Sequence, residues 1–250
     1  MIEGIWGLVV LALSFGGFVK GVVGLGLPLV ATPIVANLVG PRTAVVVLAI
    51  PIGLTNVWVV ARGGLGWAEL RPLTGLLVGQ LAGTYGGANL LVLLDVQRLS
   101  LYVGIVVVTF VTLQLFSVRF AISPRVASYT GPVFGFLAGV LGGSTSLFGP
   151  LLAIYLYGIG LKQRDFVVAI SLFFAVGNAG QVVAFYQLEL YTGPILIYTI
   201  LFTIPCLIGL WLGMRLQGFL NPKIFNRAVF TVLLLSALNL VWRGLAPSAG

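Results

Sequence analysis

Apolar residues form long runs along the chain, and short segments that hold most of the charged residues separate these runs. A helix needs about 20 mainly apolar residues to cross the roughly 30 Å hydrocarbon core of a bilayer. Six runs of about this length are predicted as membrane spans. They are 43–61, 72–94, 99–117, 166–187, 194–216 and 228–243.

Two further apolar runs are interrupted by glycine and proline. As one helix the run 5–39 would be about 50 Å long, too long for an ordinary span. Glycine permits unwound backbone, and proline fits the first turn of a new helix. We therefore predict two half-helices, 5–19 and 28–39, that meet at a break within this glycine-rich stretch. The same layout before Pro150 predicts half-helices at 126–141 and 150–159. Paired interruptions of this kind are typical of transporter binding sites.

The two broken segments belong to a predicted internal repeat. At an offset of 122 residues, Gly17 pairs with Gly139, Gly21 with Gly143, Pro28 with Pro150, Arg42 with Arg164 and Asn56 with Asn178. At an offset of 126 residues, Gly83 pairs with Gly209, Gly87 with Gly213 and Asp95 with Asn221. The predicted organisation is a first transmembrane repeat at 1–118, a central linker at 119–126 and a second transmembrane repeat at 127–250.

The lysines and arginines distinguish two topologies. If each broken segment crosses the membrane once, the lysines and arginines other than Lys20 divide five against seven between the two membrane faces. If each segment dips in and returns, they divide nine against three, with Arg42, Arg98 and Arg243 on the poorer face. The positive-inside rule favours the second count. The predicted fold is an all-α polytopic membrane protein with two inverted repeats, each a re-entrant helical hairpin (a broken helix) plus three transmembrane helices. Both termini are then outside.

Composition agrees with the membrane class. The chain has 250 residues, of which 60% are hydrophobic and 7% charged, far from a soluble domain. The net charge of +8 would indicate nucleic acid in a soluble protein, but here the basic residues lie in loops that orient a membrane protein. With no histidine and Cys206 as the single cysteine, no disulfide, multi-cysteine metal site or imidazole chemistry is expected. We predict no catalytic residue, metal or cofactor.

The polar groups near the two breaks are the candidate substrate-binding residues. The start of each second half-helix has free amides and a positive dipole end, which favour an anion. Lys20 would add charge, the serines and threonine would add hydroxyls, and the asparagines and glutamine would orient the substrate. The predicted site comprises Lys20, Gly24, Gly26, Leu27, Asn56, Ser144, Thr145, Ser146, Gly149, Asn178 and Gln181.

Each candidate also has a purely structural interpretation. Lys20 could extend to an interface, and the glycines could serve only to let helices pack closely. The hydroxyls of 144–146 could satisfy unwound backbone, and the asparagines could join helices. All five acidic residues fall near the ends of spans, so no deeply buried carboxylate is expected as a proton relay or sodium ligand. An anion leaving a cell gains about 2.3 kcal/mol per charge per 100 mV, which is sufficient for export, although unwound carbonyls could still bind Na⁺.

The stretch GVVGLGLPLVATP at 21–33 and its echo GFLAGVLGGSTSLFGPLLAIYLYGIGLKQRDF at 135–166 resemble the sulfite exporter TauE/SafE family of membrane permeases. The resemblance extends over essentially the whole chain. The second copy is the closer match, whereas the first departs with Lys20, Val22, Val23 and Leu25 among its glycines. The resemblance implies transport of sulfur-containing anions such as sulfite, sulfoacetate or sulfolactate.

The predicted function is therefore a secondary membrane transporter for sulfite or an organosulfonate. It would export its substrate through a midplane site between the two broken helices. The alternatives are an importer, a permease for another small anion, or a membrane sulfur-relay protein or enzyme. The expected location is the cell (inner) membrane. The expected partners are a small anionic substrate and membrane lipid, with a homodimer as an option and no nucleic acid.

Overall fold

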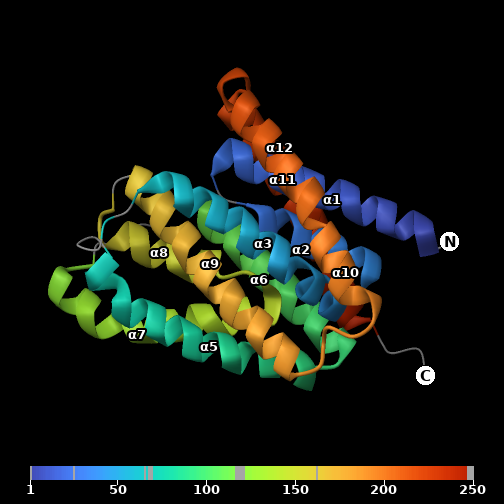
Figure 1. Cartoon of the computed structure of the whole chain (residues 1–250), viewed down its shortest axis with the longest axis horizontal. Coiled ribbons are helices and arrows are strands. Elements are labelled where there is room, and N and C mark those ends of the chain that lie inside the picture. Colours follow the sequence, from blue (N-terminus) through green and yellow to red (C-terminus); the bar gives the residue numbers. More distant parts are fainter. Residues whose placement is uncertain are drawn as a thin grey trace. The chain divides into compact units, whose positions relative to one another are not determined.

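The computed structural model describes residues 2–24, 26–64, 66, 70–115, 122–161 and 163–246 of the chain. Every secondary-structure element in these ranges is a helix (Figure 1). The elements are α1 (Ile2–Val23), α2 (Leu27–Val39), α3 (Pro41–Gly63), η1 (Arg71–Leu73), α5 (Thr74–Leu93), α6 (Val96–Leu115), α7 (Pro124–Thr145), α8 (Gly149–Gly158), α9 (Gln163–Gln187), α10 (Pro194–Leu201), α11 (Thr203–Leu216), η2 (Gln217–Phe219) and α12 (Pro222–Leu245). Within the predicted linker, 119–121 lie outside the described residues.

Six of these helical segments are long and apolar enough to cross a membrane. Five contain the predicted spans 43–61, 72–94, 166–187, 194–216 and 228–243, to within a residue or a few at their ends. The sixth is α1, which the sequence analysis treated as half of a broken segment. The predicted span 99–117 corresponds to α6, whose apolar part Val96–Thr112 is shorter, and 116–117 lie outside the described residues. The all-α polytopic membrane fold is confirmed, whereas the inversion of the repeats stays a prediction.

The helices divide into two compact units, and each unit takes segments from both halves of the sequence. Unit 1 comprises Met1–Pro51, Val92–Ser117 and Gly193–Gly250, and unit 2 comprises Ile52–Leu91 and Val118–Thr192. Unit 1 therefore holds α1, α2, α6, α10, α11 and α12, whereas unit 2 holds most of α5 and all of α7, α8 and α9. Helix α3 begins in unit 1 and ends in unit 2.

The chain reverses direction at each break, so each broken segment is an antiparallel hairpin. In unit 1, a Cβ on Gly16 of α1 would lie 3.2 Å from the Cβ of Ala31 in α2. In unit 2, the Tyr155 hydroxyl of α8 donates to the Ala127 carbonyl oxygen of α7 at 2.6 Å. A broken helix that continued in one direction would bring neither pair together.

The glycines before each break pack helices instead of unwinding them. A Cβ on Gly139 of α7 would lie 2.2 Å from the Gln80 carbonyl oxygen of α5, and one on Gly17 of α1 would lie 2.3 Å from the Cys206 carbonyl oxygen of α11. Only glycine permits backbones to approach this closely. Gly139 lies 122 residues after Gly17, and Cys206 lies 126 residues after Gln80. The same close contact therefore recurs in both units, at positions that the two sequence offsets relate.

This packing corrects the predicted positions of the breaks. Helix α1 continues to Val23 and not to 19, and α7 continues to Thr145 and not to 141. Within the described part of the two hairpins, positive φ angles first occur after these helix ends, at Gly24 (φ 83°), Gly26 (φ 129°) and Ser146 (φ 61°). The unwound part of each hairpin is therefore shorter than the glycine pattern indicates.

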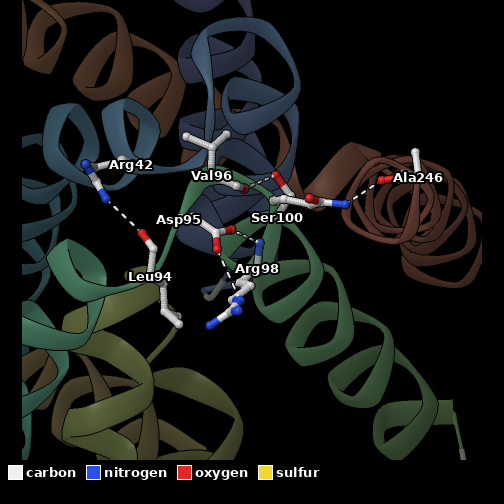
Figure 2. A network of polar contacts seen from close by, with 8 residues as sticks. Arg42, Leu94, Asp95, Val96, Arg98, Ser100 and Ala246 are labelled. Carbon is white, nitrogen blue, oxygen red and sulfur yellow. Dashed lines mark hydrogen bonds and ion pairs between the residues drawn. The ribbon is translucent and has the colours of Figure 1, made fainter. Parts of the chain in front are cut away.

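Helices α5 and α6 meet at a polar turn in unit 1 (Figure 2). The Nη2 of Arg42 donates to the carbonyl oxygens of Val92 and Leu94 at 3.1 and 2.8 Å, which satisfies the end of α5. Asp95 caps α6: its Oδ1 accepts from the Arg98 backbone N–H at 2.8 Å, and its Oδ2 lies 3.1 Å from Arg98 Nε.

The ends of α2 and α12 lie at this same end of unit 1. Gln97 of α6 donates to the Ala246 carbonyl oxygen just after α12. Arg243 of α12 donates from Nη1 to the Asn37 carbonyl oxygen of α2 at 3.0 Å. Through these contacts, the three arginines Arg42, Arg98 and Arg243 gather at one end of unit 1.

Candidate functional site

The break between α7 and α8 is a buried turn that is followed by an uncapped helix start. Ser146 ends α7 in the left-handed conformation, and its backbone N–H donates to the Gly142 carbonyl oxygen at 2.6 Å. Helix α8 begins at Gly149 with Pro150 in its first turn and has no side-chain cap. Both residues are buried. The first amides of such a helix have no partner within the helix, so they can bind an anion.

Gln181 of α9 holds the end of α7 in place. Its Nε2 donates to the carbonyl oxygens of Gly142 and Gly143, each at 3.1 Å, and lies 3.2 Å from the Ser146 hydroxyl. Gln181 and Ser146 are fully buried. From the sequence, Gln181 is expected to orient the substrate. In the structure its amide contacts the helix break itself and thereby fixes the conformation of the turn.

Ser144 and Thr145 lie within the last turn of α7. The Ser144 hydroxyl donates to the Val140 carbonyl oxygen at 2.6 Å, and the Thr145 hydroxyl donates to the Leu141 carbonyl oxygen at 2.5 Å. The Thr145 hydroxyl also accepts from the Leu147 N–H at 3.2 Å. These two hydroxyls therefore satisfy helix-end backbone, as their structural interpretation expected. Ser146 is the member of the trio that lies at the turn.

Asn56 and Asn178 make the same local contact at their paired positions. The Nδ2 of Asn56 donates to the Ile52 carbonyl oxygen at 2.8 Å, and that of Asn178 donates to the Phe174 carbonyl oxygen at 2.7 Å. Both side chains are almost fully buried in unit 2. The Asn178 Oδ1 has no hydrogen-bond partner among the described residues. Asn178 therefore presents an unpartnered acceptor one helical turn from Phe174. The Phe174 ring in turn lies against the start of α8, since it is 3.3 Å from where a Cβ on Gly149 would be.

The break between α1 and α2 carries the remaining candidates. Helix α2 begins at Leu27 with Pro28 in its first turn, and its N-cap residue Gly26 provides no side-chain bond. Lys20, in the last turn of α1, is only 3% exposed, and buried Cys206 of α11 lies against Gly17, one turn earlier in α1. Among the side chains that the structure describes, Lys20 is the only buried one of a charged type. A charge buried in a membrane protein is costly and is a functional candidate by default.

The structure brings the predicted residues together in two groups. Lys20, Gly24, Gly26 and Leu27 lie in unit 1. Asn56, Ser144, Thr145, Ser146, Gly149, Asn178 and Gln181 lie in unit 2. A single site that uses both breaks stays a prediction. Among the described residues, no cluster of His, Cys, Asp or Glu could hold a metal ion.

Sequence reasoning missed two residues beside the α7–α8 break. Gln80 of α5 is fully buried and donates from Nε2 to the Phe173 carbonyl oxygen at 2.8 Å. Phe148, the N-cap residue of α8, lies with its ring against the Cα atoms of Gly142 and Gly177. The sequence does carry a signal for Gln80, because its amide is a polar group within an apolar, glycine-rich span.

Comparison with known proteins is consistent with this fold. The comparisons with curated proteins and with solved structures found no match. The model of the family described as sulfite exporter TauE/SafE matches residues 9–240, which include both hairpins and all six long apolar helices except their outer ends. This match confirms the resemblance seen in 21–33 and 135–166. The chain is a multi-pass membrane protein that belongs to the sulfite exporter TauE/SafE family, a family of membrane transporters.

Proposed function

We propose that this transporter carries sulfite or a small organosulfonate and exports it from the cell. The observation that carries the proposal is the buried, uncapped start of α8 beside Ser146, Asn178 and Gln181. A sulfonate or sulfite group presents several acceptor oxygens, and the free amides of a helix start are suited to them. Ser146 adds a hydroxyl, while Gln181 keeps the turn in the conformation that exposes these donors.

The break in unit 1 contributes positive charge to anion binding. Helix α2 also starts without a side-chain cap, and the buried Lys20 lies in the last turn of α1, just before this break. A cation buried in a membrane protein is a functional candidate by default, and its positive charge favours an anionic ligand. Alternating access would move each hairpin together with the helix against which its glycines pack.

Export requires no coupling carboxylate. Among the side chains that the structure describes, none of the buried residues is acidic. An anion that leaves a cell with a negative interior gains about 2.3 kcal/mol per charge per 100 mV of membrane potential. The potential alone therefore provides a sufficient driving force.

Counterflow in proteoliposomes tests the substrate class. We expect the purified protein to exchange labelled sulfite for sulfite, sulfoacetate or sulfolactate, because each offers the same oxyanion to the α8 start. Exchange should saturate, and chloride at equal concentration should compete poorly. Protein-free liposomes provide the background. Absence of exchange for every sulfur oxyanion, with folded protein in the bilayer, would rule out the proposed function.

The arrangement of unit 1 supports re-entrant hairpins. If each broken segment crossed the membrane once, Arg243 would lie on the face opposite Arg42 and Arg98. In unit 1 the three arginines lie at one end, where Gln97 contacts Ala246. This agrees with the nine-against-three count of the re-entrant topology, in which these three arginines are outside.

Cysteine labelling in intact cells tests this topology. In a background with Cys206→Ser, we expect Gln97→Cys and Ala246→Cys both to react with a membrane-impermeant maleimide, because both lie on the outer face. Gln217→Cys, after α11, should react only once the cells are opened. Protection of Ala246→Cys in intact cells would contradict an outside C-terminus, and reaction of Gln217→Cys would contradict the assignment of the basic face.

A further inference from the structure

We propose that Gln80 is a further substrate-binding residue, and that its Oε1 accepts a hydrogen bond from a substrate anion that carries an O–H group. The inference rests on the proposed function and narrows its substrate class. The favoured ligands are hydroxysulfonates and hydrogen sulfite, in preference to fully deprotonated anions without a donor.

The orientation of the Gln80 amide follows from its one hydrogen bond. The Phe173 carbonyl oxygen, 2.8 Å away, can only accept, so the atom that faces it is Nε2. The amide cannot be turned over without losing this bond. Oε1 is therefore held as an acceptor, and it has no hydrogen-bond partner among the described residues.

Gln80 lies close to the break between α7 and α8 in unit 2. A Cβ on Gly177 of α9 would meet Gln80 Nε2 at 2.3 Å and the Phe148 ring at 2.8 Å. The Gln80 amide and the N-cap residue of α8 thus flank the same glycine. The amide that carries the unpartnered acceptor therefore shares a neighbour with the N-cap residue of α8, the helix whose start is proposed to bind the anion.

A buried acceptor without a donor is unfavourable, so its retention needs an explanation. Gln80 is 0% exposed, and its neighbours at 76–79 and 81–83 of α5 are apolar or glycine, whereas the buried Thr84 hydroxyl donates to the Gln80 backbone carbonyl oxygen. Gln181, one α9 turn from Gly177, differs in that both ends of its amide lie at hydrogen-bonding distance from other groups. Oε1 of Gln80 is the atom that remains for a ligand.

The ligand group opposite Oε1 must carry hydrogen. A bare sulfonate or sulfite oxygen is itself an acceptor, and two acceptors at hydrogen-bonding distance repel each other. A hydroxyl group beside the sulfonate, or the proton of hydrogen sulfite, supplies the missing donor. A site built around a buried acceptor discriminates strongly against an analogue that lacks the donor.

The test compares isethionate with ethanesulfonate, which have the same charge and differ by one hydroxyl group. Both compete with labelled sulfite in proteoliposomes that contain the full chain. We expect isethionate to inhibit at about tenfold lower concentration with the wild type, as one buried hydrogen bond allows. With Gln80→Met, which keeps the length and volume of the side chain, the two should inhibit within about twofold of each other.

Thr84→Val is the matched control. Thr84 is also buried in α5, and its hydroxyl donates to the Gln80 backbone carbonyl oxygen at 2.8 Å. This variant removes a structural bond but leaves the Gln80 Oε1, so the hydroxyl preference should persist even if thermal stability falls. If Gln80→Met still favours isethionate over ethanesulfonate, the proposal is wrong. It is also wrong if the wild type shows no such preference, a result that needs no variant.

The outcomes also distinguish this inference from the proposed function. Sulfite exchange without a hydroxyl preference would leave the proposed function standing and reject the role of Gln80. A Na⁺ requirement that disappears in Gln80→Met would reassign Oε1 as a cation ligand and reject the inference. No exchange of any sulfur anion would reject both.

Discussion

Replacing Gly87 by alanine is expected to destabilise the protein and to abolish most transport, whereas the same change at its neighbour Gly86 is expected to do neither. A Cβ on Gly87 would lie 2.3 Å from the Val140 carbonyl oxygen and 3.0 Å from both the Gly143 Cα and the Ser144 backbone nitrogen. All three are backbone atoms of α7, so no side-chain rotation can relieve the clash. Helices α5 and α7 must separate.

The loss in free energy of unfolding should exceed the roughly 1–3 kcal/mol of ordinary overpacking, because all the close backbone contacts between α5 and α7 loosen together. Gly143 and Ser144 lie directly before the turn at Ser146, so the displacement also reaches the helix break. We therefore expect a lower midpoint of thermal unfolding in detergent, together with loss of sulfite exchange. Leucine at the same position should prevent recovery of folded protein.

Gly86 provides the matched control because it lies next to Gly87 in the same helix, at an exposed position that makes no close backbone contact with α7. A Cβ there would approach only a Val140 methyl group, at 4.0 Å. Alanine also has the better helix propensity, so Gly86→Ala should change stability by no more than about 1 kcal/mol. Equal effects of the two alanines would refute the assignment of Gly87 to helix packing.

Replacing Lys20 by methionine is expected to reduce sulfite exchange by about 100-fold, the loss typical of removing one partner of a desolvated charge pair. The side chain is 3% exposed, so its ammonium group is shielded from solvent and acts strongly on a nearby anion. Methionine keeps a long apolar side chain and removes the charge. Counterflow with purified variant and wild type measures the difference.

The size of the stability change separates a binding role from a structural one. If the ammonium group serves binding, Lys20→Met should lose exchange while its midpoint of thermal unfolding stays close to that of the wild type. Cys206→Ala, which alters the buried α11 neighbour of Lys20, is the control and should keep exchange within about threefold. Wild-type exchange in Lys20→Met would remove Lys20 from the site. A large fall in stability would assign it to packing.

The sequence by itself determined the class of the protein and the location of its helices. Hydrophobic length is a local property, so five of the long membrane helices agree with the runs read from the chain. The proline that starts each second hairpin helix was also readable, because proline lacks a donor and tolerates few other positions. The pairing of Asn56 with Asn178 was likewise visible, and both make the same bond to their own helix.

The exact breaks could not be read from the sequence, because glycine serves two purposes with one signature. Gly21 and Gly143 fall in the predicted breaks, yet they are helical and permit close backbone contact. Whether a glycine unwinds or packs depends on a partner helix far away in the chain. Within the described part of the two breaks, the positive φ angles of a turn occur at Gly24, Gly26 and Ser146.

The polar network of unit 2 was also decided by tertiary structure alone. Gln181 was predicted to face substrate but binds the carbonyl oxygens that end α7, and Gln80 was not predicted at all. Each hairpin packs against a helix from the other half of the sequence: α1 against α11, and α7 against α5. The composition of one segment sets its length and its propensity to break. Which amide meets which carbonyl depends on the register between segments 38 to 93 residues apart, and no local pattern records that register.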